Sequence, residues 1–112
     1  MKIEIKNNKI YCNYFGKAYA NITNNRFYAT IEIIKVDPQF RGKKIATALL
    51  SSIIKYIRQN IKNIKMIVLS PLPLDSNGLK IEQLVNFYKR YNFSPINNPP
   101  IHSPYMMSLK LI

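Results

Sequence analysis

The chain has 112 residues, of which 47% are apolar, enough for the core of one compact domain but not of two. Seventeen Lys and Arg residues against five Asp and Glu residues give a formal net charge of +12, which favours nucleic acid, acidic proteins or an anionic cofactor as partners. The single Cys12 excludes an internal disulfide, and together with one histidine, His102, it argues against a zinc site or any other bound metal.

The basic charge is unevenly placed. Seven basic residues follow one another with no acidic residue between them: Arg41, Lys43, Lys44, Lys55, Arg58, Lys62 and Lys65. The chain is also rich in Ile, Asn and Lys, so drift in an AT-biased genome is an alternative source of part of the charge. No apolar run approaches the ~20 residues of a membrane helix, and the first residues lack the apolar region of a signal peptide. We expect a single soluble cytoplasmic domain over residues 1–112, with no membrane partner.

Residues 1–36 have the pattern of strands, because apolar residues recur among polar ones. Turn signals separate them at Asn7-Asn8, Gly16 and Asn24-Asn25. The simplest prediction is an antiparallel meander of three strands, ending at Ile31–Val36 where Asp37-Pro38 stops the last one.

The rest of the chain alternates helix and strand. The predicted elements are a helix over Lys43–Asn60, a strand over Ile64–Leu69, a loop over 70–78, a helix over Leu79–Tyr91, a loop over Ser94–Pro104 and a closing strand over Tyr105–Leu111. The order β-β-β-α-β-α-β predicts an α/β (α+β) domain with a mixed sheet of about five strands and two main helices.

The segment from Val36 to Leu50 carries the strongest functional signal. It combines a strand, a sharp turn and the beginning of a helix flanked by Arg41, Lys43 and Lys44. Unpaired backbone N–H groups and the positive end of a helix dipole both favour an anion there. A pyrophosphate is the natural ligand.

This segment resembles motif A of the Gcn5-related N-acetyltransferase superfamily, Val-x-Pro-x-x-Arg-Gly-x-Gly-x-Ala/Gly. Arg41, Gly42, Ile45 and Ala46 match it, and Lys44 stands where the family prefers a glycine, which permits a positive φ. The resemblance implies that acetyl-CoA is the cofactor and co-substrate. Its expected contacts are Ile34 and Val36 on the strand, the turn and helix start Arg41, Gly42, Lys43, Lys44, Ile45, Ala46 and Thr47, and Ser76 or Asn77 in the loop.

A second match is Asn86–Phe93, which is similar to the family's motif B, a helix ending in Leu-Tyr-x-x-x-Gly-Phe. Tyr88 occupies the position of the family's general acid, and Asn92, which tolerates left-handed geometry, replaces the glycine. The family's asparagine seven residues before the tyrosine is replaced by Ile81, so its contact is lost or supplied by Ser76 or Asn77. Together the two motifs cover roughly residues 26 to 112.

The N-terminal helices usual in the family are missing. This brevity, with the opening Met-Lys-Ile-Glu and the Pro/Asp/Ser loop before the second helix, is similar to the miniature phage-encoded anti-CRISPR acetyltransferases directed at type V nucleases. In that case the protein acts in the cytoplasm of the host.

The resemblance further implies that the strands over residues 31–36 and 64–70 splay apart around the cofactor. A substrate lysine has a reference pKa of roughly 10.4, so a base must remove a proton before attack. Glu32 is the candidate base, since its side chain is expected on the same face as Ile34 and Val36. Tyr88 would protonate the departing thiolate.

The expected reaction is acetyl transfer to a lysine or N-terminus of a protein, acidic or associated with nucleic acid. One alternative is acetylation of aminoacyl-tRNA or a nucleobase. The other is a non-enzymatic basic module in which the Arg41–Lys44 turn contacts phosphates and tyrosines stack on bases. The chain is expected to be a monomer or, through its open sheet edges, a homodimer.

Overall fold

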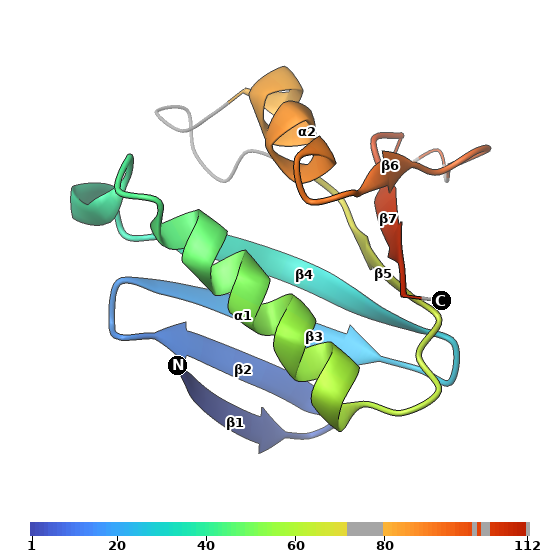
Figure 1. Cartoon of the computed structure of the whole chain (residues 1–112), viewed down its shortest axis with the longest axis horizontal. Coiled ribbons are helices and arrows are strands. Elements are labelled where there is room, and N and C mark those ends of the chain that lie inside the picture. Colours follow the sequence, from blue (N-terminus) through green and yellow to red (C-terminus); the bar gives the residue numbers. More distant parts are fainter. Residues whose placement is uncertain (72–79, 100, 102–103, 112) are drawn as a thin grey trace.

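The computed structural model describes residues 1–71, 80–99, 101 and 104–111. In these residues seven strands form one sheet and two α-helices pack on it (Figure 1). The strands are β1 (Lys2–Lys6), β2 (Lys9–Tyr14), β3 (Ala18–Asn24), β4 (Tyr28–Val36), β5 (Met66–Leu69), β6 (Ser94–Pro95) and β7 (Met107–Lys110). The helices are α1 (Ile45–Asn60) and α2 (Ile81–Lys89), and a single 3₁₀ turn, η1 (Pro38–Phe40), comes before α1.

The sheet is mixed, in the order β1-β2-β3-β4-β5-β7-β6. Its one parallel pair in the described part of the chain is β4 with β5, and α1 forms the crossover that a parallel pair requires. The predicted fold class, with its mixed sheet and two main helices, is confirmed.

The predicted number of strands was too low, mainly because the N-terminal meander has four strands rather than three. Asn7 and Asn8 have φ of 48° and 65°, so they form a two-residue hairpin turn that separates β1 from β2. The short β6 lies in the segment predicted as a loop, and its Pro95 is accommodated because the strand lies at the sheet edge.

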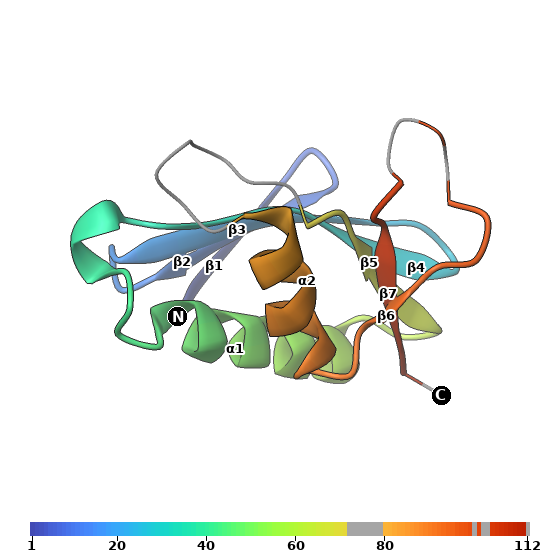
Figure 2. The ribbon, with the colours of Figure 1, turned by 90° about the horizontal axis from the view of Figure 1, so that it is seen from above.

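Both helices cover the same face of the sheet, and no helix of the described residues covers the other (Figure 2). On β3, Ala18, Ala20 and Ile22 are buried toward the helices, while Tyr19 is 42% exposed on the opposite side. The apolar residues of α1 recur at helical spacing, and its buried side chains are Leu49, Leu50, Ile53 and Ile57. We call the two sides the helix face and the open face.

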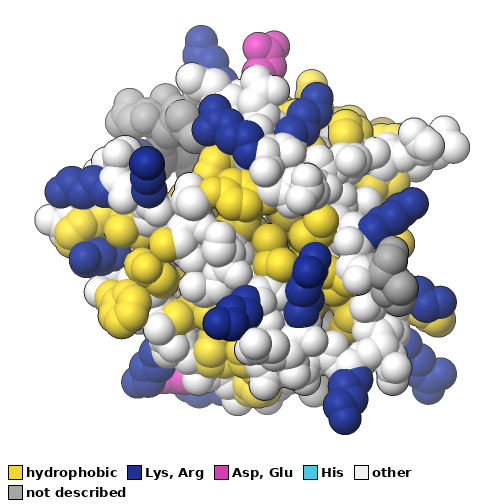
Figure 3. Space-filling view, in the orientation of Figure 1, with side chains coloured by type: hydrophobic (Ala, Val, Ile, Leu, Met, Phe, Trp, Pro, Cys, Tyr) yellow, Lys and Arg dark blue, Asp and Glu magenta, His cyan; other side chains and the backbone are white. Residues whose placement is uncertain are grey.

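Basic side chains are spread over the outside of the helix face. Figure 3 shows Lys and Arg around α1 and α2 with little acidic surface between them. In the described residues, neither helix has the length and apolar character needed to cross a membrane.

Candidate functional site

The strands β4 and β5 pair along only part of β4. Their register runs from Tyr28↔Met66 to Ile31↔Leu69, where β5 ends, whereas β4 continues to Val36. Within the described residues, the later part of β4 pairs only with β3. Figure 1 shows β4 and β5 diverging toward their C-terminal ends. The predicted splay is confirmed, and Ile34 and Val36 lie in the section of β4 that β5 leaves.

A β-bulge in β4 lies at the point of divergence. Asn21 pairs with Ile33 but Ile22 pairs with Ile31, so Glu32 is the extra residue. The bulge reverses the alternation of side chains: Ile34 and Val36 pair with the buried Ala20 and Ala18 and pack on the core, on the helix face.

Glu32 does not share that face. Its carboxylate Oε1 lies 3.4 Å from Nζ of Lys9, whose strand neighbour Ile10 is buried on the helix face, so Lys9 and Glu32 both lie on the open face. The prediction that Glu32 shares a face with Ile34 and Val36 was therefore wrong, because regular alternation was assumed across a bulge. Glu32 lies beside the strand divergence, on the side not covered by helices.

The turn between β4 and α1 is built from backbone hydrogen bonds. The Phe40 N–H donates to the Asp37 carbonyl at 2.9 Å, and the Gln39 N–H donates to Oδ1 of Asp37 at 3.2 Å. Gly42 then has φ of +77° and Lys44 φ of 62°, so the backbone is left-handed at both positions. A Cβ built on Gly42 would meet nothing within 4 Å, so the space beside this turn is open.

Helix α1 begins directly after this turn and has no side-chain cap. Lys44 is the N-cap and makes no side-chain capping bond, and the first turn of Ile45, Ala46 and Thr47 holds no acidic residue. The first N–H groups of a helix have no carbonyl partner within the helix, and the helix dipole makes this end positive. Arg41, Lys43 and Lys44 add positive charge there, so the site fits a phosphate group.

Two cations from different segments meet at Phe40. The Nζ atoms of Lys17, from the β2–β3 turn, and of Lys43 lie 5.4 and 5.9 Å from the centre of the Phe40 ring. Attraction of an ammonium group by an aromatic ring is worth about 0.5–1 kcal/mol at exposed sites. Neither Lys17 nor Phe40 was predicted as a site residue. Lys17 lies in a hairpin turn outside both motifs, and Phe40 stands at a position of motif A where the family has no fixed residue.

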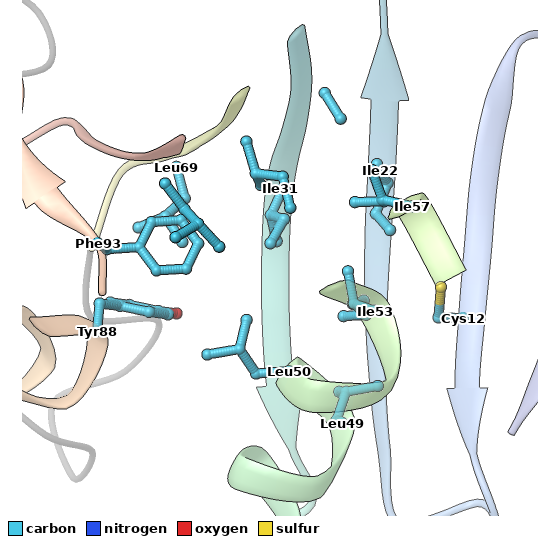
Figure 4. Close-up of a cluster of buried hydrophobic side chains, with 14 of the residues drawn as sticks. Cys12, Ile22, Ile31, Leu49, Leu50, Ile53, Ile57, Leu69, Tyr88 and Phe93 are labelled. Carbon is cyan, nitrogen blue, oxygen red and sulfur yellow. The ribbon is translucent and has the colours of Figure 1, made fainter. Parts of the chain in front are cut away.

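Tyr88 is buried where α2 packs on the sheet, with 8% of its surface exposed. Its ring centroid lies 5.2 Å from that of Phe87 and 5.8 Å from that of Phe93, both in edge contacts. Figure 4 shows the Tyr88 ring beside Phe93, with its hydroxyl directed toward β4. Burial raises the pKa of Tyr88 to about 12, so the hydroxyl keeps its proton at neutral pH. Asn92 has φ of 70°, as expected where the family has glycine.

Two predicted contacts and the two residues weighed as metal ligands remain to be placed. Ser76, Asn77 and His102 lie outside the described residues. Cys12 is buried, and burial raises its pKa to about 11, which disfavours the reactive thiolate. In the described part of the chain, no group of three or more His, Cys, Asp or Glu side chains lies close enough to hold a metal ion.

Comparison with known proteins agrees with this architecture. A family model described as the acetyltransferase (GNAT) domain matches residues 4–95, which is more than half of the chain. The chain therefore belongs to the Gcn5-related N-acetyltransferase family. None of the curated proteins compared with the chain by sequence matches it.

Solved structures share the fold at low sequence identity. The crystal structure of the anti-CRISPR protein AcrVA5 superposes with a TM-score of 0.74 at 17% identity, covering 90% of this chain and 97% of that one. The PaiA N-acetyltransferase of Thermoplasma acidophilum, in complex with coenzyme A, has a TM-score of 0.64 at 18% identity, covering 91% and 59%. The ribosomal-protein-S18-alanine N-acetyltransferase of Escherichia coli has a TM-score of 0.66 at 17% identity, covering 92% and 68%. At these identities the likeness shows the fold.

Proposed function

We propose that the protein transfers an acetyl group from acetyl-CoA to an amine of a protein, either a lysine side chain or an N-terminus. The observation that carries this proposal is the divergence of β4 from β5 beside the Gly42–Lys44 turn and the uncapped start of α1. The section of β4 with which β5 does not pair leads directly into this turn. Such an arrangement suits a long molecule with phosphate groups at one end, because the phosphates can bind at the turn while the rest lies along β4.

The chain offers groups for each part of acetyl-CoA. Arg41, Lys43 and Lys44, with the backbone of Gly42 and the first turn of α1, suit the diphosphate. The backbone of Ile34 and Val36 suits the pantetheine amides, because β5 does not pair with this section of β4. Ser76 and Asn77 stay predicted contacts. Bound acetyl-CoA supplies an activated acyl group and a thiol leaving group.

Two side chains suit the proton transfers. Glu32, on the open face, would accept a proton from the ammonium form of the incoming amine, which must be neutral to attack. Tyr88, which reaches toward β4 from the helix face and stays protonated at neutral pH, would donate its phenolic proton to the departing sulfur. Placing acid and base on opposite sides of the strand gap lets the amine enter from the open face.

The acceptor is proposed to be a macromolecule. The open face of the described residues carries no helix that would enclose a small metabolite. The net charge of +12 suits an acidic or nucleic-acid-associated protein. AcrVA5 matches this chain over 97% of its own length, which supports including proteins of a CRISPR system among the acceptors to be tested. Aminoacyl-tRNA is the competing acceptor.

Thermal unfolding with acetyl-CoA tests the donor. A ligand that binds only the folded chain at a hundred times its Kd adds about 2.7 kcal/mol to the free energy of unfolding, so Tm should rise by several degrees. No rise at millimolar acetyl-CoA would contradict the proposal. Mass spectrometry of a cell lysate incubated with the protein and isotopically labelled acetyl-CoA then identifies the acceptor, and label on RNA alone would exclude a protein acceptor.

A further inference from the structure

A shallow pocket of about 290 Å³ opens on the open face, at the C-terminal end of β4. Three of its lining residues form one row across the sheet, because Asn13 pairs with Tyr19 and Tyr19 pairs with Lys35. Lys17 from the β2–β3 turn and Asp37 after β4 complete its polar lining. Neither sequence motif includes Asn13, Tyr19 or Lys35.

The polar groups of this pocket favour an anionic guest. Lys17 and Lys35 contribute two positive charges, against one negative charge from Asp37, and Oδ1 of Asp37 already accepts from the Gln39 N–H. Asn13 accepts from the Gly16 N–H at 2.8 Å through Oδ1, so its amide NH₂ is the part that can donate. The ammonium group of Lys17 lies over the Phe40 ring. A carboxylate in the pocket would therefore pair with the ammonium group of Lys35 and the amide of Asn13, and Lys17 adds positive charge nearby.

The turn beside the pocket presents an aromatic side chain at a conformational cost. Phe15 adjoins the pocket residue Gly16, is 69% exposed and has φ of 53°, a left-handed conformation that is rare for a bulky residue. The turn is held by the Lys17 N–H donating to the Tyr14 carbonyl at 2.9 Å and the Asp37 N–H donating to the Lys17 carbonyl at 2.8 Å. The Phe15 ring makes an edge contact with Tyr14, with the ring centroids 4.8 Å apart. The exposed remainder of the ring is suited to contact a partner.

The pocket lies close to the proposed base. Glu32 and Lys35 both lie on the open face, three residues apart on β4, which is about 10 Å at the rise of a strand. An extended acceptor segment covers that distance in about three residues. We propose that the pocket binds an acidic side chain of the protein acceptor, two to four residues from the amine that is acetylated. This inference rests on the proposed function and specifies its acceptor.

A peptide series tests this directly. Each peptide has a blocked N-terminus, one lysine in a Gly/Ser/Ala background and one Glu placed one to six residues from the lysine on either side; matched peptides carry Gln instead. We expect kcat/KM to peak for Glu two to four residues away, about tenfold above the Gln peptide, as for a hydrogen bond to a charged group. Fluorescence anisotropy of the labelled peptides without acetyl-CoA should rank them in the same order.

Two variants make the test specific. Lys35→Glu should abolish the preference for Glu in both kinetics and binding, while the Tm rise with acetyl-CoA is kept. Lys6→Glu makes the same charge change on the open face of β1, in the row of Lys9 at the other end of the strands, and should keep the preference.

The outcomes separate the two proposals. Acetylation without any preference for Glu, or an equal loss in Lys6→Glu, overturns this inference and leaves the acetyltransferase proposal standing. No acetylation and no Tm rise contradict the proposed function, and Lys35-dependent binding of the Glu peptide would still support the pocket. Tighter Lys35-dependent binding of a single-stranded oligonucleotide than of the Glu peptide would mean that nucleic acid occupies the pocket, and would overturn the inference.

Discussion

The carboxylate of Glu32 lies 3.4 Å from the ammonium group of Lys9, on the open face beside the divergence of β4 and β5. The two side chains are 39% and 45% exposed. An ion pair this exposed contributes at most about 1 kcal/mol to stability. The pair can therefore be broken from either side without unfolding the protein, which makes the role of Glu32 testable.

Glu32→Gln should lower kcat by about a hundredfold or more at neutral pH, as loss of a general base does, with Tm changed by only a few degrees. Lys9→Met breaks the same ion pair and keeps the carboxylate, so its kcat should stay within a few-fold of the parent protein. Steady-state kinetics on a lysine peptide measure both. Equal small losses in the two variants would mean that Glu32 serves only as the partner of Lys9.

Tyr88→Phe should lower kcat by about a hundredfold, because the departing sulfur loses its proton donor. The rise of Tm with acetyl-CoA should persist, since the ring still packs on Phe87 and Phe93. Phe87→Leu, which alters the neighbouring ring and keeps the hydroxyl, is the matched control and should retain most of kcat. Loss of the acetyl-CoA effect in Tyr88→Phe would instead make Tyr88 a structural residue.

Alkaline pH should destabilise the fold through Tyr88. Its pKa rises from 10.0 to about 12 on folding, so the folded state favours the protonated phenol. The resulting stability is fully present below pH 10 and is lost as pH rises through 12; two units correspond to about 2.7 kcal/mol. The free energy of unfolding, measured with denaturant, should fall more steeply with pH over this window for the parent protein than for Tyr88→Phe.

Cys12 also makes the fold less stable at alkaline pH, and at lower pH than Tyr88 does, because its pKa rises from 9.0 to about 11 on folding. The contribution of the buried thiol to the free energy of unfolding is fully present below pH 9 and is lost as pH rises through 11. Making both measurements in a Cys12→Ala background therefore isolates the tyrosine. Parallel pH profiles with and without the Tyr88 hydroxyl would show that its burial does not couple to folding.

Lys44→Gly should stabilise the protein by about 1 kcal/mol, because Lys44 has φ of 62° and a left-handed conformation costs a residue with a Cβ about that much. Lys44→Ala removes the same charge and keeps the strain. Both variants should bind acetyl-CoA more weakly than the parent, and Lys44→Gly more tightly than Lys44→Ala, as judged by Tm with and without the ligand. Equal stability of the two variants would contradict the claim that the left-handed conformation at Lys44 costs stability.

Local patterns in the sequence were enough for both helices and for the position of the turn between β4 and α1, but not for the number of strands. The helical spacing that buries Leu49, Ile53 and Ile57 is a property of consecutive residues, and so is the stop at Asp37-Pro38. Asn92 was predicted to take the left-handed conformation that it has, because few residues adopt it readily. The family motif likewise lies within one continuous segment, from Val36 to Ala46.

Only the tertiary structure decided which side chains meet across strands. The face of Glu32 depends on a bulge, and a bulge is a mismatch between β3 and β4 that neither strand reveals alone. Lys17 reaches Phe40, and Lys35 shares a pocket with Asn13, through pairings between segments far apart in the chain. The sequence by itself determined the turn and helix start that carry the acetyltransferase motif. The sheet register determined which side chains of other strands lie beside them, because register is set by packing between strands.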